Sequence, residues 1–417
     1  MDIKMKYGLI GEKLAHSFSP EIHKEFGNDD YVLCPIKKDK LADFLRAKDF
    51  CGINVTIPYK QDVIPYLDEI DKTAEQIGAV NTIIKDKNGK LIGYNTDCYG
   101  FSALLSYNNI SVKNKKCLVL GSGGASKTAC HVLNESQVSE CIVISRHGEN
   151  NYENISSHYD ADIIINTTPL GMYPENGKSA VDCSLFKNLQ AAVDLIYNPR
   201  KTKFLLEAQK NNIATADGLY MLVAQAKRAA ELFFGKPILD TETERVYRKI
   251  ERQITNIVLI GMPSCGKTTI GQLIANKMKR TFVDTDEKIR TDSGMDLTDI
   301  IKNNGEPFFR TLETAAVKQI GKATGIVIAT GGGIVTKNEN FHPLKQNSLI
   351  FYLQRPLDKL ISDGRPLSST KEKIAALFEV RSPLYESLAD YKVNSDNLEE
   401  AADEIIKIFN NYFKTEA

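Results

Sequence analysis

One short stretch of the sequence combines the residue types that bind a triphosphate. It reads G-M-P-S-C-G-K-T from Gly261 to Thr268, and the apolar run 257–260 precedes it. In such a stretch backbone amides wrap the phosphates, the lysine bridges the β- and γ-oxygens, and the threonine hydroxyl coordinates Mg²⁺. We therefore predict an ATP site on a strand, a loop and a helix, formed by Gly261, Ser264, Cys265, Gly266, Lys267, Thr268 and Thr269.

A second glycine-rich turn follows the apolar run 117–120. Glycines allow close approach to a pyrophosphate, and the helix that begins after them favours its charge. The next apolar run, 141–145, ends in Arg146 with no carboxylate before Glu149, which suits the 2′-phosphate of NADP(H) better than the ribose of NAD. A tight turn without a ligand, followed by a solvated arginine, remains the alternative. The predicted cofactor residues here are Gly121, Ser122, Gly123, Gly124, Ala125, Ser145 and Arg146.

These loops need strands to position them, and strand-like runs alternate with helix-like runs along most of the chain. This alternation predicts α/β domains with parallel sheets. The expected strands are 6–10, 52–56, 116–120, 141–145, 162–166, 191–194, 256–260, 325–329 and 349–353. Helices are expected over 222–234 and about 240–252. A few residues separate the second helix from the strand at 256, so we expect two catalytic parts with a short junction at 252–255.

Composition limits the function classes. The chain has 417 residues, with 53 Lys plus Arg and 53 Asp plus Glu, so no long-range field attracts nucleic acid or an anionic membrane. The eight cysteines form no C-x-x-C pair, which favours a reducing compartment. No run reaches the ~20 apolar residues of a membrane helix. We expect a cytoplasmic enzyme with small-molecule substrates, no nucleic-acid or membrane partner, and a monomeric or homodimeric state that the sequence leaves open.

Polar clusters in the first half lie at or near predicted strand ends, where an open α/β sheet places its ligand crevice. With the later motifs they resemble shikimate dehydrogenase over residues 4–251. The resemblance implies a substrate domain of residues 1–98 with 219–251, and a Rossmann-like NADP domain of residues 99–218. The motifs that carry it are G-E-K-L-A-H-S-F-S-P from Gly11, N-V-T-I-P-Y-K from Asn54, G-A-V-N-T from Gly78, G-Y-N-T-D from Gly93, N-T-T-P-L-G-M from Asn166, D-L-I-Y-N-P from Asp194 and D-G-L-Y-M-L-V-A-Q-A from Asp217.

The dehydrogenase resemblance implies roles for single residues. Lys60 and Asp97 match the catalytic pair, in which an ammonium stabilises an alkoxide and donates a proton while a carboxylate orients it. The hydroxyls of Ser17, Ser19 and Tyr197 are implied to hold the substrate carboxylate, although Ser19 could instead cap a helix before Pro20. The remaining implied contacts are Thr56, Asn81 and Gln225 for the ring hydroxyls, and Thr167, Gly218 and Met221 for the cofactor. We expect His16 and His23 to be structural.

The second half resembles shikimate kinase over residues 256 to about 413, which implies a P-loop domain of residues 256–417 with a parallel sheet flanked by helices. Asp286 is implied to bind and orient the acceptor hydroxyl, Asp284 to support Mg²⁺ with Thr268, and Arg365 to reach the phosphates from a short lid at about 354–370. Arg310 and Arg381 are implied to bind the acceptor carboxylate. The motifs are F-V-D-T-D from Phe282, G-E-P-F-F-R-T-L-E from Gly305 to Glu313, T-G-G-G from Thr330 with Gly331, Gly332 and Gly333 at the substrate, G-R-P-L from Gly364 and R-S-P-L-Y from Arg381.

The two resemblances imply consecutive reactions on one cyclic acid. The first half would reduce 3-dehydroshikimate with NADPH, and the second would phosphorylate the resulting shikimate with Mg-ATP. Alternatives are a ligand-sensing regulator without catalysis, a NAD-dependent quinate dehydrogenase fused to another small-molecule kinase, and a P-loop nucleic-acid motor. The presence of Lys60, Asp97, Lys267 and Asp286 disfavours the first, Arg146 and Arg310 disfavour the second, and zero net charge disfavours the third.

Overall fold

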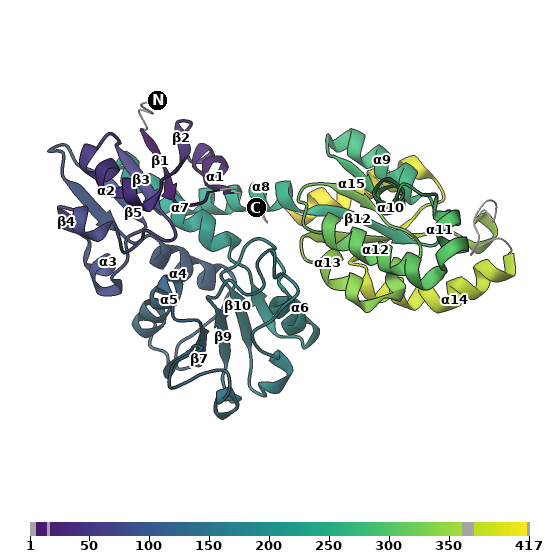
Figure 1. Cartoon of the computed structure of the whole chain (residues 1–417), viewed down its shortest axis with the longest axis horizontal. Coiled ribbons are helices and arrows are strands. Elements are labelled where there is room, and N and C mark those ends of the chain that lie inside the picture. The colour runs from purple at the N-terminus through teal and green to yellow at the C-terminus, as the bar shows by residue number, and fades with distance from the viewer. Residues whose placement is uncertain (1–5, 15–16, 361–370, 415–417) are drawn as a thin grey trace. The chain divides into compact units, whose positions relative to one another are not determined.

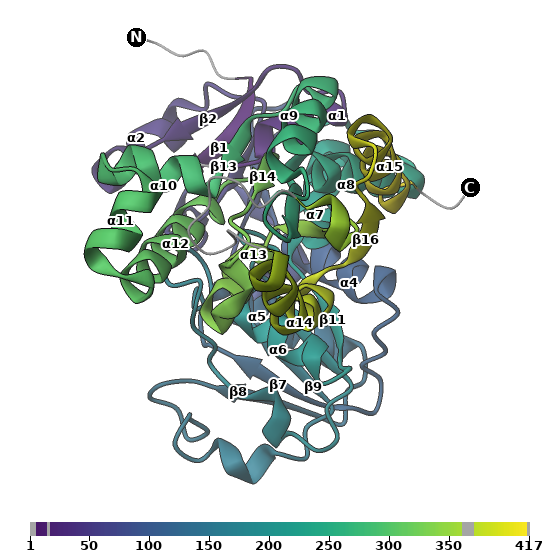
Figure 2. The ribbon, with the colours of Figure 1, turned by 90° about the vertical axis from the view of Figure 1, so that its right-hand side faces the viewer.

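The computed structural model describes residues 6–14, 17–360 and 371–414. The chain divides into two compact units, Met1–Tyr247 and Arg248–Ala417, and each is described by itself below (Figures 1 and 2). Over the described residues no helix has both the length and the apolar character needed to cross a bilayer.

The first unit begins with a six-stranded sheet in the order β2-β1-β3-β5-β6-β4. β1, β2 and β3 are parallel, whereas β5 runs antiparallel to both β3 and β6. The sheet is therefore mixed, and the β5–β6 hairpin is absent from the predicted strands. The strands are β1 (Tyr7–Gly11), β2 (Tyr31–Pro35), β3 (Gly52–Val55), β4 (Glu69–Ile70), β5 (Thr82–Lys85) and β6 (Leu91–Tyr94), with helices α1 (Ser19–Glu25), α2 (Lys38–Ala47) and α3 (Lys72–Ile77).

A second sheet of the same unit is wholly parallel, in the order β11-β10-β9-β7-β8. From β7 the chain passes first to β8 on one side and then to β9 on the other, so the strand order reverses at β7. Ligands of open α/β sheets bind at such a reversal. The elements are β7 (Lys116–Leu120), α5 (Gly124–Glu135), β8 (Glu140–Ile144), β9 (Ile163–Asn166), β10 (Ala191–Asp194), α6 (Lys203–Lys210) and β11 (Ala214–Ala216).

Two long helices connect the sheets of the first unit. α4 (Asp97–Tyr107) leads from the first sheet to the second, and α7 (Leu219–Phe234) returns and packs against α4. The next helix, α8 (Asp240–Ile254), contains the boundary between the two units after Tyr247 and extends into the predicted junction 252–255. The predicted domain limits within the first unit remain predictions.

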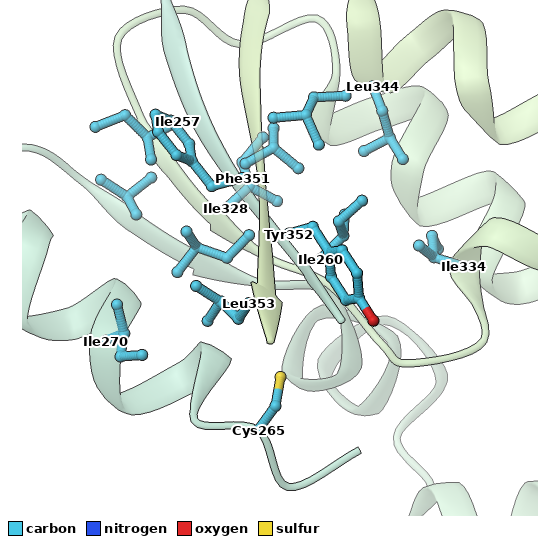
Figure 3. Packing of buried hydrophobic residues seen from close by; sticks show 14 of the residues in the cluster. Ile257, Ile260, Cys265, Ile270, Ile328, Ile334, Leu344, Phe351, Tyr352 and Leu353 are labelled. Atoms are coloured by element: carbon cyan, nitrogen blue, oxygen red, sulfur yellow. The ribbon is translucent and has the colours of Figure 1, made fainter. Parts of the chain in front are cut away.

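The second unit has one five-stranded parallel sheet in the order β13-β14-β12-β15-β16. Apolar side chains of β12, β14 and β15 form its core together with those of α9 (Figure 3). The elements are β12 (Asn256–Gly261), α9 (Lys267–Met278), β13 (Phe282–Asp284), α10 (Thr285–Ser293), α11 (Leu297–Asn304), α12 (Glu306–Ile320), β14 (Val327–Ala329), α13 (Phe341–Lys345), β15 (Ser348–Gln354), α14 (Lys371–Leu388), β16 (Tyr391–Asn394) and α15 (Leu398–Tyr412).

All nine predicted strands and both predicted helices are present, with ends that differ by at most about three residues. The α/β fold class is confirmed. The parallel arrangement holds for the second and third sheets and fails in the first, where β5 is antiparallel to both β3 and β6.

Candidate active sites

A cavity of about 360 Å³ lies in the first unit, between the first sheet and the start of α7. Residues far apart in the sequence meet there. All eight residues predicted to bind the first substrate line it: Ser17, Ser19, Thr56, Lys60, Asn81, Asp97, Tyr197 and Gln225. Of the residues predicted along the cofactor path, Ala125, Gly218 and Met221 line the same cavity.

Lys60 and Asp97 form an ion pair at the wall of this cavity. Lys60 Nζ lies 2.6 Å from Asp97 Oδ2, and the two side chains are 26% and 15% exposed. Asp97 is the first residue of α4, where the helix dipole favours a negative charge. The carbonyl of Lys60 accepts a hydrogen bond from the amide of Val80, which fixes the backbone beneath the ammonium. The pair can therefore present an oriented proton donor to a ligand in the cavity.

A hydrogen-bond network holds the polar side chains beside this pair. Asn81 Oδ1 accepts from the Thr96 amide at 2.7 Å, and Asn81 Nδ2 donates to Thr96 Oγ1 at 3.0 Å. Thr96 Oγ1 in turn donates to Gln225 Oε1 at 3.3 Å, which links the N-cap of α4 to α7. Thr96 was not among the predicted site residues, although it stands in the quoted motif directly before Asp97. Its buried hydroxyl orients the amides of both Asn81 and Gln225.

The hydroxyl groups at another part of the wall come from the start of α1 and from Tyr197. Ser17 Oγ donates to Ser19 Oγ at 3.0 Å and accepts from the Ser19 amide at 3.2 Å. The cap of α1 is Phe18, so Ser19 is not the capping residue. Burial raises the pKa of Tyr197, which keeps its hydroxyl protonated and able to donate. Lys13 also lines the cavity and was missed, although it lies in the quoted motif that begins at Gly11.

His23 is buried in the core of the first unit. Its ring stacks on Tyr31 with the centroids 3.9 Å apart, and burial lowers its pKa to about 3. A neutral, enclosed imidazole supports the predicted structural role. His16 lies outside the described residues.

The glycine turn after β7 opens on a second cavity of about 900 Å³ in the first unit. Gly121 has a φ of +106°, and a Cβ there would lie 2.9 Å from Thr167 Oγ1, so both the backbone conformation and the close side chain require glycine. The space beside Gly123 and Gly124 is open, and Gly124 begins α5. The predicted cofactor residues that line this cavity are Gly121, Ser122, Gly123, Ser145, Arg146 and Thr167.

This arrangement fits a phosphorylated dinucleotide. The start of α5 offers backbone amides and a positive helix end to a pyrophosphate. The exposed Arg146, after β8, supplies a cation at the cavity wall. Tyr152 and the segments 168–170 and 172–175 also line the cavity and were not predicted as contacts. Part of this segment belongs to the motif at Asn166–Met172, which could have pointed to it.

In the second unit the predicted phosphate loop joins β12 to α9. Gly261 and Gly266 have φ values of +148° and +95°. The buried Lys267 donates to the carbonyls of Gly261 and Met262 at 3.0 and 2.8 Å, so its ammonium lies inside the loop. Cys265 is fully buried in the core beneath the loop (Figure 3). Thr268 and Thr269 are exposed at the start of α9.

Two oxygen-bearing side chains meet beside this loop. Thr268 Oγ1 donates to Asp284 Oδ2 at 2.7 Å, and Asp284 Oδ1 accepts from the amide of Asp286 at the start of α10. A hydroxyl and a carboxylate at this distance are ligands of the kind that Mg²⁺ prefers, and the P-loop would place them next to phosphate oxygens. The residues present therefore fit the predicted metal.

Arg310 on α12 is buried between two carboxylates. Its Nη1 pairs with Glu313, and its Nε and Nη2 donate to Glu306 at 3.1 and 2.7 Å. Burial raises the pKa of Glu313 to about 7, against the opposing effect of the guanidinium. Glu306 was missed as a site residue, although its spacing of four residues before Arg310 on a helix predicts such a pair.

The glycine segment after β14 lies against these charged groups. A Cβ on Gly331 would lie 2.6 Å from Asp286 Oδ1 and 2.7 Å from Glu313 Oε1, and one on Gly333 would meet the Arg310 guanidinium. The carbonyl of Gly332 accepts from Arg381 Nη1 at 3.1 Å and from Tyr385 Oη. The structure thus brings Asp286, Arg310, Arg381 and the three glycines together. Arg365 and most of the predicted lid lie outside the described residues.

Known protein families match one segment in each of the two units. The family model for the shikimate dehydrogenase substrate binding domain matches residues 9–83, and the model for shikimate kinase matches residues 263–410. The NADP(+)-dependent shikimate dehydrogenase of Clostridium beijerinckii is 40% identical over 267 residues, covering 59% of this chain and 98% of that relative.

Solved structures show the same likeness. A chorismate mutase/shikimate 5-dehydrogenase fusion protein from Clostridium acetobutylicum is 38% identical, with a TM-score of 0.56 over 59% of this chain and 96% of that one. Shikimate 5-dehydrogenase from Thermus thermophilus, in complex with NADP(H) and shikimate, is 30% identical, with a TM-score of 0.54 over 59% of this chain and 99% of that one. The chain belongs to the shikimate dehydrogenase family, and a shikimate kinase domain follows in its C-terminal unit.

Proposed function

We propose that the first unit reduces 3-dehydroshikimate to shikimate with NADPH. The Lys60–Asp97 pair supports this proposal, because ketone reduction needs a proton donor beside the developing alkoxide. Lys60 stabilises the alkoxide and delivers the proton, and Asp97 holds the ammonium in place. The bound cofactor supplies the hydride.

The other polar residues of the cavity bind the substrate. The hydroxyls of Ser17, Ser19 and Tyr197 receive the carboxylate, and Asn81 and Gln225, oriented through Thr96, meet the ring hydroxyls. Thr56 completes this set. On the cofactor side, the amides at the start of α5 bind the pyrophosphate, and Arg146 binds the 2′-phosphate that distinguishes NADP from NAD.

For the second unit we propose ATP-dependent phosphorylation of shikimate. Lys267 moves from its loop carbonyls to the β- and γ-oxygens, and Thr268 and Asp284 hold the Mg²⁺ that screens the phosphate charge. Asp286 orients the attacking hydroxyl and accepts its proton. Arg310 and Arg381 bind the carboxylate, for which the planar guanidinium is well suited.

The observation that carries the proposal is the presence, in one chain, of two separate sites whose proposed ligands are the product and the substrate of consecutive reactions. Covalent fusion keeps the two activities in equal amounts. It does not require that shikimate pass directly between the sites.

The test is a coupled assay on the full chain with 3-dehydroshikimate, NADPH and Mg-ATP, which follows NADPH loss and ADP formation. Lys60→Ala is expected to abolish NADPH oxidation, while ADP still forms from ATP when shikimate is added. Lys267→Ala is expected to abolish ADP formation and to leave NADPH oxidation unchanged. Each variant therefore serves as the control for a general loss of activity in the other. If purified chain with intact Lys60 and Lys267 failed both half-reactions, the proposed function would be wrong.

A further inference from the structure

A further cavity of the first unit, of about 470 Å³, has no role in the proposed reduction. The residues that line it are a separate set from those that line the substrate and dinucleotide cavities. Its walls come from α4, from the start of α7 and from the first turn of α8, all within the first unit. The cavity is larger than the one that holds the cyclic substrate in our proposal, so a ligand with a single ring has room in it.

Tyrosine rings form one wall of this cavity. Tyr107 and Tyr220 stack with their centroids 4.0 Å apart, and the buried Tyr247 packs edge-on against both. Burial raises the pKa of Tyr220 to about 12, so its hydroxyl stays protonated near neutral pH. The face of a neutral tyrosine ring is electron-rich, and it attracts cations and the edges of other rings. This wall therefore suits a ligand that is aromatic, cationic or both.

The side of α4 that faces the cavity provides space and hydroxyl groups. Five residues spaced three or four positions apart, or next to such a position, lie along this side of the helix: Tyr99, Ser102, Ala103, Ser106 and Tyr107. All five are uncharged, although the solvent side of a helix is usually rich in charged residues. The methyl group of Ala103 and the two serines leave room beside the tyrosine rings.

The charge at the cavity comes from α8. Asp240 Oδ1 accepts hydrogen bonds from Lys227 Nζ at 2.5 Å and from Tyr99 Oη at 3.3 Å. The bond from Lys227 lowers the pKa of Asp240, so the carboxylate is ionised at neutral pH. The Asp240 side chain is 88% exposed, whereas that of Lys227 is 4% exposed and also pairs with Glu231. A ligand in the cavity therefore meets the carboxylate and not the enclosed ammonium.

A buried hydroxyl lies on the same side of α8. Thr243 follows Asp240 by three residues, so the two side chains are neighbours on the helix surface. Thr243 is 3% exposed, and the described part of the chain offers its Oγ1 no hydrogen-bond partner. Buried polar atoms normally have such a partner. Because Thr243 lines the cavity, a hydrogen-bond donor of a bound ligand can supply it.

We propose that this cavity binds an aromatic primary ammonium, in which a short chain joins a ring to a protonated amine. The ring packs against the wall of Tyr107 and Tyr220, and the ammonium donates to the Asp240 carboxylate and to the Thr243 hydroxyl. An anion of the same size would be repelled by Asp240. A neutral compound with the same ring would lack the charge-assisted hydrogen bond.

The test is isothermal titration calorimetry of the full chain with 2-phenylethylamine at neutral pH. We expect saturable binding with a dissociation constant of about 1 mM or lower, as for a fragment-sized ligand. 2-Phenylethanol has the same ring without the charge, and 2-cyclohexylethylamine has the same charge without the aromatic face. Each is expected to bind about fivefold more weakly or worse.

Two variants locate the binding. Asp240→Asn should weaken the binding of 2-phenylethylamine by about fivefold, because it removes the exposed charge. Ala103→Phe should abolish the binding, because the added ring fills the cavity. Glu242→Gln is the matched control, since it removes one negative charge from the same turn of α8 at a residue that does not line the cavity. Asp240→Asn changes an exposed side chain and serves as the test even if Ala103→Phe folds poorly.

An excess of shikimate is expected to leave the binding of 2-phenylethylamine unchanged, because the two cavities have no lining residue in common. Absence of binding to the unsubstituted chain, or equal binding to Asp240→Asn, would overturn the site. Equal binding of 2-phenylethanol would overturn the charge assigned to the ligand. Competition by shikimate would place the amine in the substrate cavity and would also overturn the proposal. Calorimetry records binding and not turnover, so none of these results depends on the proposed reactions.

Discussion

At the scale of single residues, Arg310 already pairs with two carboxylates through the groups that a substrate carboxylate would use. Its Nε and Nη2 both donate to Glu306, and its Nη1 is paired with Glu313. Glu313 is buried, whereas the Glu306 side chain is 44% exposed and can leave. A substrate carboxylate that uses the Arg310 fork must therefore displace Glu306.

From this competition we predict that Glu306→Gln lowers the KM for shikimate in the kinase reaction. Loss of one partly exposed ion pair is worth about 1 kcal/mol, which corresponds to a decrease of about fivefold, with kcat little changed. Steady-state kinetics at saturating ATP measures both constants. Glu313→Gln is the matched comparison, and it should instead impair the enzyme, because it removes the buried partner that holds Arg310. A raised KM in Glu306→Gln would show that Glu306 assists binding.

Much of the site could be predicted at this scale, because its residues stand in contiguous motifs. Lys60 and Asp97 are 37 positions apart and still form the ion pair that their motifs implied. The link through Thr96 to Gln225 joins positions 129 apart, and no local pattern contains such a contact. The pair of Arg310 with Glu306 could have been predicted from helical spacing alone.

At the scale of elements, the carboxyl end of β10 buries an acid that accepts hydrogen bonds from three neighbours. Asp194 accepts from Thr202 Oγ1, Asn166 Nδ2 and the Ile196 amide, yet burial raises its pKa to about 7. An unfolded aspartate has a pKa near 4. Between these values the folded chain keeps a proton that the unfolded chain has lost.

The free energy of unfolding of the first unit is therefore expected to fall as pH rises from about 4 to about 7, and to change little outside that window through this group. Asp194→Asn should reduce the slope, since an amide has no proton to lose there. The slope is measured from the thermal midpoint, across this pH range, of the unfolding transition whose midpoint rises when NADPH is added. Asp182→Asn is the control, because the pKa of that nearly exposed carboxyl is lowered and lies below the window. An equal slope in wild type and Asp194→Asn would contradict the prediction.

Strand prediction was most successful where strands are buried on both faces. The strands that it missed are the β5–β6 hairpin and β2, β4, β11, β13 and β16. β7, β9 and β12 read as continuous apolar runs, which is typical of parallel strands covered by helices. β5 and β6 are short and enclose the turn 86–90, where Gly89 has a φ of +79° and Asp86 accepts from the amides of Asn88 and Lys90. The Asn88-Gly89 turn is a local hairpin signal that could have revealed the pairing of β5 with β6. The antiparallel pairing of β5 with β3 joins segments that are distant in sequence, and no local pattern contains it.

At the scale of the whole molecule, each unit has its own hydrophobic core. Among the described residues, the cluster of the second unit is formed by residues from Ile257 onward, and the clusters given for the first unit are formed by residues up to Phe233. A ligand that binds one folded unit stabilises that unit by an amount set by its concentration and dissociation constant. The two units should therefore respond to different nucleotides.

We accordingly predict two separable thermal transitions in the full chain. NADPH at about 100 times its dissociation constant should stabilise one of them by about 2.7 kcal/mol and leave the other unchanged, and Mg-ATP should do the opposite. Differential scanning calorimetry measures both, and Lys267→Ala should remove only the response to ATP, because that ammonium lies within the phosphate loop of the second unit. A single transition that both nucleotides raise together would mean that the two cores unfold as one cooperative unit. In that case a mutation that destabilised either site would reduce both activities, and the reciprocal controls of the coupled assay would no longer separate the two steps.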